Sequence, residues 1–187
     1  MDLQRALQDA LQHHQAGRLQ QAETHYRQIL GVDPNNASVL HLLGVLAHQV
    51  NQHQAAIDLI QAAIQRNPSD PSFYNNLGSA CAALGRAADA ITCYRKAIAL
   101  SPQIPGAHHN LGVALHQTGQ VAAAIEEYRL AIQHKPDYGG AYADLSAALL
   151  TIGKMDEAAQ AARMALQIEP DSATAHATLA KVNGTTC

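Results

Sequence analysis

The stretch PSFYNNLGSACAALGRAADAITCYRKAIALSPQI, residues 71–104, decides the fold, because the chain repeats its pattern. Its second proline belongs to a series of five prolines spaced 34 residues apart: Pro34, Pro68, Pro102, Pro136 and Pro170. A strict period of this length is typical of one supersecondary unit copied in tandem. The period divides the chain into five units, 3–36, 37–70, 71–104, 105–138 and 139–172, followed by a half unit, 173–184, that is expected to cap the array.

The other columns of this alignment predict what each unit is. Position 20 is alanine in every unit and position 8 is always small, which favours two helices whose backbones pack closely. Position 15 holds residues that tolerate the positive φ of a helix end: Gly17, Asn51, Gly85, Gly119 and Gly153. The proline column then ends the second helix, because proline cannot continue one. Each unit is therefore predicted to be helix A, a tight turn and helix B.

Composition excludes several classes of protein. Hydrophobic residues make up 48% of the chain, which excludes a disordered polymer, while aromatics make up only 4%, so alanine and leucine must do the packing. The net charge of −3, with basic residues spread along the chain, argues against a nucleic-acid partner. No apolar run is long enough to span a membrane or to form a signal peptide. The three cysteines, Cys81, Cys93 and Cys187, form no framework, which favours a reducing cytoplasm.

Taken together, Leu77-Gly78, Gly85, Ala90, Tyr94 and Pro102 resemble the tetratricopeptide repeat, and the resemblance extends over almost the whole chain. It implies an all-α fold: a right-handed α-solenoid, or superhelix, of helix-turn-helix hairpins that forms a single domain over 1–187. It also implies that the A helices line a concave groove, that the B helices lie outside, and that the groove binds a protein or peptide partner.

In this family the groove is lined mainly by helix A positions 2, 5, 6, 9, 12 and 13. On this chain the resemblance therefore implies a polar set of groove residues: His41, His48, Asn75, Asn76, His109, Asn110, His116, Gln117 and Asp144.

Two of these amides form a pattern of their own. Asn76 and Asn110 each precede a Leu-Gly pair, and a side-chain amide can pair with a peptide backbone both as donor and as acceptor. The pattern resembles the asparagine ladder of O-linked N-acetylglucosaminyltransferases and the repeats of bacterial SPINDLY-like proteins. Leu42 and Asp144 interrupt the ladder on either side. The alternative is a polar helix face that happens to use asparagine.

The histidines raise the question of a metal. No two of them lie three or four residues apart, so no single helix presents a metal-binding pair, and a site would need one histidine from each of two neighbouring helices. We expect neither a metal nor another cofactor. Hydrogen bonding in the groove, with some sensitivity to pH, is the expected role of the histidines.

No catalytic motif appears, so the sequence predicts a non-enzymatic scaffold that binds an extended peptide or partner segment. Helix A of units two to five carries no Lys or Arg, which argues against a carboxylate clamp. Two alternatives stay open. The chain could be the substrate-recruiting arm of a SPINDLY-like O-GlcNAc transferase whose catalytic domain lies elsewhere, or it could self-associate through the apolar half unit at 173–184.

Overall fold

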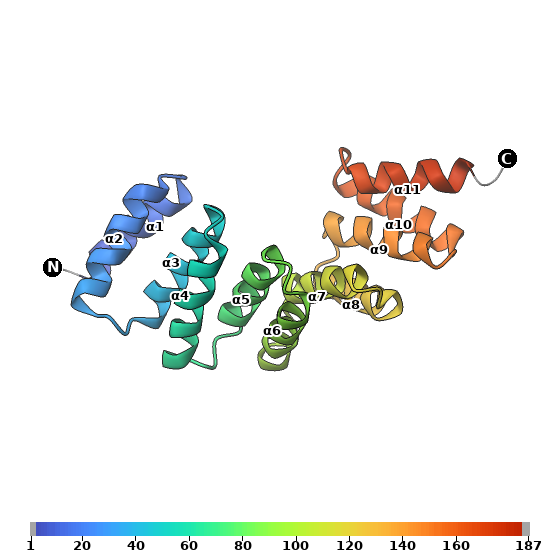
Figure 1. The fold of residues 1–187 in the computed structure, drawn as a ribbon. Helices are drawn as coiled ribbons and strands as arrows, with labels where there is room; N and C mark the ends of the chain where they lie inside the picture. Colours follow the sequence, from blue (N-terminus) through green and yellow to red (C-terminus); the bar gives the residue numbers. More distant parts are fainter. Residues whose placement is uncertain (1–2, 185–187) are drawn as a thin grey trace. The chain divides into compact units, whose positions relative to one another are not determined.

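The computed structural model describes residues 3–184, and within that range the chain forms eleven α-helices and no strand (Figure 1). The first ten helices pair into five hairpins, and α11 follows the last one. The predicted fold class, an all-α solenoid of helical hairpins, is confirmed. The helices are α1 (Leu3–Gln15), α2 (Leu19–Val32), α3 (Ala37–Gln49), α4 (His53–Arg66), α5 (Pro71–Ala83), α6 (Ala87–Leu100), α7 (Pro105–Gln117), α8 (Val121–His134), α9 (Gly139–Thr151), α10 (Met155–Ile168) and α11 (Ala173–Gly184).

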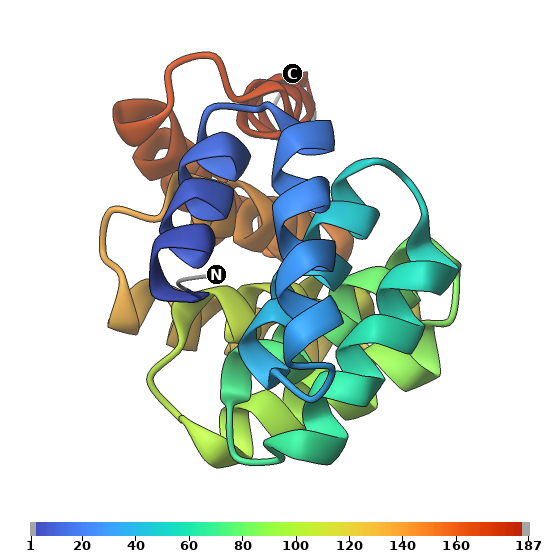
Figure 2. The same cartoon turned by 90° about the vertical axis from the view of Figure 1, so that its left-hand side faces the viewer.

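The chain divides into two compact units, each described by itself: an N-terminal unit that ends at Leu100 and a C-terminal unit that begins at Ser101. In the N-terminal unit α1 and α2 lie side by side as one hairpin (Figure 2), α3 packs on α2, and α5 packs on α4. In the C-terminal unit α9 packs on α8, and α11 packs on both α9 and α10. The single-domain organisation predicted from the sequence stays a prediction.

The turns inside the hairpins take the backbone conformation that the position 15 column predicts. The four glycines of that column have φ between +71° and +80°, and Asn51 has φ of +61°. Around the first turn, the Gly17 N–H donates to His14 O at 3.0 Å and the Arg18 N–H donates to His13 O at 2.9 Å. These bonds satisfy carbonyls that the end of a helix leaves without partners.

Helix A begins in different ways in different hairpins. The Asn36 side chain accepts a hydrogen bond from the Val39 N–H at 3.1 Å, and Asp70 accepts one from the Ser72 N–H at 2.9 Å, so both act as N-caps. Helix α7 begins instead with Pro105, which is preorganised for a first helical position. Helix α9 begins after Tyr138 with no side-chain cap.

The small residue at position 8 leaves room for the large side chain at position 24 of its own hairpin. A Cβ atom added at Gly112 would lie 2.6 Å from Tyr128 Cε1, and one added at Gly78 would lie 2.6 Å from Tyr94 Cε1. Both tyrosines are buried. In these two hairpins the closest contact of position 8 is with the ring at position 24, whereas a Cβ atom added at Gly44 would also lie 3.2 Å from the backbone oxygen of Ala56, at position 20.

Helix α11 covers the end of the last hairpin with a partly polar contact. Ser146, which occupies position 8 of the fifth unit, is fully buried; its hydroxyl donates to Ala143 O at 2.7 Å, and its oxygen lies 3.1 Å from Thr178 Oγ1. Ala175 and Val182 of α11 are buried beside Thr178. Among residues 3–184, none of the helices is both long and apolar enough to cross a membrane.

Candidate partner-binding surface

Three predicted groove residues of the N-terminal unit form one hydrogen-bonded cluster. His41 of α3 is buried, and its Nε2 lies 2.8 Å from Nδ2 of Asn76 on α5. Asn75 Nδ2 donates in turn to Asn76 Oδ1 at 3.3 Å. These contacts use one N–H group and one lone pair of the Asn76 amide, which leaves its second N–H and second lone pair for other partners.

The surroundings of His41 favour its neutral form. The imidazole packs against the Phe73 ring, with 4.5 Å between the ring centroids. Burial lowers the pKa of His41 below its ordinary value, and the Asp70 carboxylate opposes that shift. A neutral His41 can accept the hydrogen bond from the Asn76 amide, whereas an imidazolium cannot.

His48 lies at the other end of α3 and contacts its own hairpin. Its Nδ1 atom is 3.1 Å from Nδ1 of His53, the first residue of α4, and both side chains are half-buried. Burial and, secondarily, the neighbouring His53 lower the pKa of His48. The structure therefore separates His48 from the cluster around Asn76.

In the C-terminal unit His109 of α7 lies between two polar side chains. Its Nε2 atom is 2.8 Å from Oδ2 of Asp144 on α9, and its Nδ1 atom is 3.1 Å from the Tyr138 hydroxyl. The structure thus brings together two predicted site residues, His109 and Asp144. The Asp144 carboxylate also contributes, after burial, to raising the pKa of Tyr138.

A hollow of about 650 Å³ opens on the A helices of the C-terminal unit. The predicted residue His116 lines it, with Nε2 at 3.5 Å from Thr151 Oγ1 of α9. The rest of the lining is small or hydroxylated apart from one leucine and one lysine: Ala147, Leu150, Thr151, Thr174, Ala177, Thr178 and Lys181. Helices α7, α9 and α11 therefore share one concave site.

Two further predicted residues of α7 lie outside this hollow. Gln117 is exposed at the C-terminal end of the helix, and Asn110 is half-buried near its middle. The sequence reasoning missed Thr174 and Lys181, because the half unit was read as a cap and a possible self-association surface rather than as part of the groove. Leu150 and Thr151, at positions 12 and 13 of the fifth unit, were the signal that could have identified part of its lining, though not the hollow itself.

His108 is a buried histidine that the groove prediction did not include. Its Nδ1 atom lies 2.7 Å from Oε2 of Glu127 on α8, and its Nε2 atom lies 2.9 Å from Pro102 O. The ring also stacks on His134, with 5.5 Å between the ring centroids. With one nitrogen bound to its own hairpin and the other to the loop before α7, His108 has a structural role.

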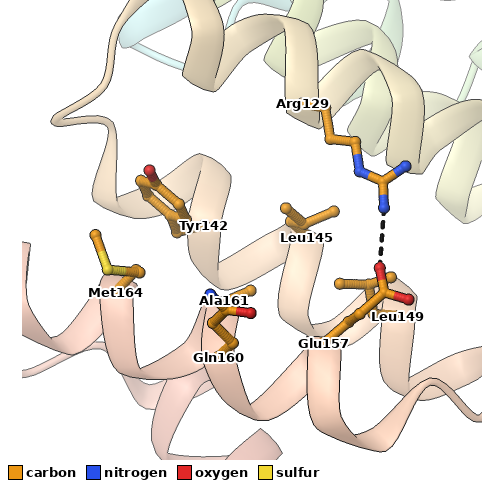
Figure 3. A pocket seen from close by; sticks show the side chains of 8 residues that line it. All are labelled: Arg129, Tyr142, Leu145, Leu149, Glu157, Gln160, Ala161 and Met164. Carbon is orange, nitrogen blue, oxygen red and sulfur yellow. Dashed lines mark hydrogen bonds and ion pairs between the residues drawn. The ribbon is translucent and has the colours of Figure 1, made fainter.

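A second hollow, of about 360 Å³, lies on the side formed by α8, α9 and α10 (Figure 3). Its apolar lining comes from Leu145 and Leu149, with Met164 at one end. At the other end Arg129 Nη2 and Glu157 Oε2 form an ion pair at 3.0 Å. Both charged groups are exposed, so this ion pair contributes little to stability.

The two cysteines in the described part of the chain face each other within one hairpin. Cys81 of α5 and Cys93 of α6 are both free thiols, and each influences the pKa of the other. Burial, and then the neighbouring Cys81, raises the pKa of Cys93 to about 12. Thiols in such surroundings are poor nucleophiles at neutral pH. Cys187 lies outside the described residues.

Comparison with protein families gives matches over most of the chain. The model described as "Tetratricopeptide repeat" matches residues 13–81 and 119–182, and the model described as "TPR repeat" matches residues 78–119. No curated protein sequence matches the chain.

Solved structures resemble the chain over nearly its full length. A crystal structure of MamA is 28% identical, with a TM-score of 0.77, and the match covers 88% of this chain and 96% of that one. YrrB, described as a TPR protein with an unusual peptide-binding site, is 18% identical with a TM-score of 0.74, and the match covers 92% and 89% of the two chains. PilF of Pseudomonas aeruginosa is 19% identical with a TM-score of 0.90, over 98% and 84%. At these lower identities, YrrB and PilF show likeness of fold alone.

Proposed function

Because the chain belongs to the tetratricopeptide repeat family, we propose that it is a non-enzymatic interaction module that binds an extended peptide or partner segment on its A helices. The A helices are α1, α3, α5, α7, α9 and α11. The observation that carries this proposal is the hollow lined by α7, α9 and α11, which is formed by A helices only.

The lining of this hollow suits part of a peptide. Ala147 and Ala177 are small, so they leave space beside Leu150 for an apolar side chain of the partner. The Thr151 and Thr174 hydroxyls and the His116 ring add hydrogen-bonding groups to its lining. The hollow thus combines an apolar pocket with a few polar groups, as peptide-recognition sites commonly do.

In the N-terminal unit, Asn76 is the residue best suited to meet a peptide backbone. Its hydrogen bonds to His41 and Asn75 fix the orientation of the amide, so binding costs little side-chain entropy. Its second N–H and its second lone pair are the groups that would pair with the peptide. Asn110, the equivalent residue of α7, has the same chemistry, and we propose the same role for it.

The experiment tests whether a bulky side chain placed in the hollow prevents peptide binding. Ala147→Trp places a large ring in it, and Ala122→Trp, at an exposed position of α8, is the matched control. Linear peptides enriched on the wild-type chain from a phage-displayed random library are then measured by fluorescence anisotropy. We expect them to bind the wild type and Ala122→Trp with similar affinity and Ala147→Trp at least about tenfold more weakly.

Two results would contradict the proposal. If the enriched peptides bind Ala147→Trp as well as the wild type, the hollow is not the binding site. If no peptide is enriched at all, the chain does not act by capturing linear segments. Circular dichroism of each variant shows whether the helices are retained.

A more specific role is that of a substrate-recruiting arm of a SPINDLY-like O-GlcNAc transferase. The Asn-Leu-Gly triplets at 76–78 and 110–112, both on A helices, favour it. Reading the gene beyond codon 187 tests its single-chain form, because a stop codon there rules out a downstream catalytic domain in the same polypeptide. The free thiols of Cys81 and Cys93 support a reducing, cytoplasmic location.

A further inference from the structure

At the turn between α3 and α4, two histidines meet through their ring nitrogens. The Nδ1 atoms of His48 and His53 are 3.1 Å apart. The ring planes are inclined by 52°, and the ring centroids are 4.9 Å apart. The two Nδ1 atoms are thus closer together than the centres of the rings. Because no single helix presents a metal-binding pair of histidines, a metal site needs one histidine from each of two neighbouring helices. His48 on α3 and His53 on α4 meet that condition.

The separation of the two nitrogens fits two ligands of one metal ion. Imidazole nitrogens lie about 2.0–2.1 Å from a bound zinc ion. Two such ligands are therefore about 2.9 Å apart when they subtend a right angle at the ion, and about 3.3 Å apart at the tetrahedral angle. The observed 3.1 Å lies between these values. We propose that His48 and His53 bind one divalent transition-metal ion through their Nδ1 atoms.

The turn fixes the backbone that carries both histidines before any ion arrives. Asn51 adopts φ of +61°, its N–H donates to His48 O at 3.0 Å, and the Gln52 N–H donates to Ala47 O at 2.8 Å. In the metal-free protein the two Nδ1 atoms point at each other, so both rings must rotate before their lone pairs meet at one ion. The ion then replaces the proton that the two nitrogens share in the metal-free protein. Imidazole ligands favour Cu²⁺, Ni²⁺ and Zn²⁺ over Mg²⁺ or Ca²⁺.

Two other pairs of histidines on the chain lack this geometry. The rings of His13 and His25 stack with only 11° between their planes, and Nδ1 of His13 accepts a hydrogen bond from Arg18. His108 also stacks on His134, and its two nitrogens are already engaged. These pairs are therefore natural controls.

The rest of the coordination sphere comes from outside this pair. Among residues 3–184, no group of three or more His, Cys, Asp or Glu side chains could hold a metal ion. Water would fill the other positions in the isolated protein. The site is therefore open, and a histidine or carboxylate of a partner could complete it.

The test is a Cu²⁺ titration of the full chain by isothermal titration calorimetry, with electron paramagnetic resonance of the bound ion. The wild type should bind one more equivalent than His48→Ala and His53→Ala, and at this site the affinity should fall at least about tenfold in either variant. The controls His25→Ala and His134→Ala should bind as the wild type does. The spectrum of the extra equivalent should show coupling to two imidazole nitrogens.

A second readout keeps the proposal falsifiable if His48→Ala folds poorly. His53 is half-buried at the start of α4, and its replacement leaves the helix interior intact. Because an ion that binds only the folded state stabilises it, Cu²⁺ should raise the melting temperature of the wild type more than that of His53→Ala. Equal binding and equal thermal shifts in the wild type and His53→Ala would overturn the proposal. The copper experiments need no peptide or protein partner. Their outcome is therefore independent of the proposed peptide binding.

Discussion

His41 and Asn76 meet across 35 residues of sequence, one more than the repeat length, with 2.8 Å between Nε2 and Nδ2. This offset joins position 5 of one A helix to position 6 of the next. The same offset also joins position 12 of one A helix to position 13 of the next. Further pairs at this spacing include His109 with Asp144, His14 with Gln49, and His116 with Thr151.

This offset changes the expected role of the predicted histidines. His41 and His109 each bind a polar side chain of the following A helix, so they hold neighbouring hairpins together. A partner would therefore meet side chains that are already fixed by one another. Such preorganisation lowers the entropic cost of binding.

The first prediction concerns the strength of the pair formed by His41 and Asn76. A double-mutant cycle with His41→Ala and Asn76→Ala, followed by urea denaturation, should give a coupling free energy of about 0.5–1.5 kcal/mol. The reason is that His41 is buried and Asn76 satisfies its Nε2 atom. A coupling near zero would show that the bond contributes nothing to stability in solution.

The second prediction is a pH dependence that comes from His41. Burial lowers its pKa in the folded state, so the unfolded chain takes up the proton first as pH falls. The stability contributed by this group is therefore fully present above the unfolded pKa of about 6.5, and it is lost as pH falls through that value towards the folded pKa.

Replacing His41 with glutamine should remove this part of the acid sensitivity. Between neutral pH and about pH 5, we expect the wild type to lose more stability in urea denaturation than His41→Gln does. His176→Gln, at an exposed position of α11, controls for the loss of one histidine. Parallel pH profiles for the wild type and His41→Gln would contradict the assignment.

The third prediction compares two glycines of α7. Gly112→Ala places a methyl group 2.6 Å from Cε1 of the buried Tyr128 ring, so it should destabilise the chain by about 1–3 kcal/mol. Gly106→Ala meets nothing within 4 Å, and it should be neutral or stabilise by up to about 1 kcal/mol. Thermal melts of the two variants measure the difference, and similar melting temperatures would disprove the contact.

The fourth prediction concerns the reactivity of Cys93. Because burial and Cys81 raise its pKa to about 12, very little thiolate is present at neutral pH. Iodoacetamide should label Cys93 in the native protein at least about a hundredfold more slowly than in urea. The rate is followed by mass spectrometry of the peptide that contains Cys93. Equally fast labelling in both states would show that the hairpin opens freely.

The sequence predicts the hairpins well because their rules are local. Glycine at positive φ and proline after helix B act within one unit, so aligned columns reveal both. The surface is harder to predict, because its contacts join residues at unequal positions of successive units. The columns grouped Asn76 with Asn110, whereas the structure binds Asn76 to His41.

The hollow on α7, α9 and α11 also could not be predicted from the aligned columns of the repeats. It depends on two small residues, Ala147 and Ala177, that leave space between three helices. An aligned column shows which residue types the repeat units have in common. It does not show where the side chains leave a volume between helices unfilled. His108 was missed for a similar reason, since it is buried at a position where the other units place Ala6, Leu40, Tyr74 and Tyr142.

The packing of tyrosine rings on small residues has an optical consequence. Tyr26, Tyr94 and Tyr128 are buried in three different hairpins, and burial raises the pKa of each. The chain contains no tryptophan that would mask their signal. Replacing two of the three by phenylalanine would leave one buried chromophore whose tyrosinate absorbance in mild alkali reports the opening of a single hairpin. The order in which the hairpins open could then be read without attaching a dye.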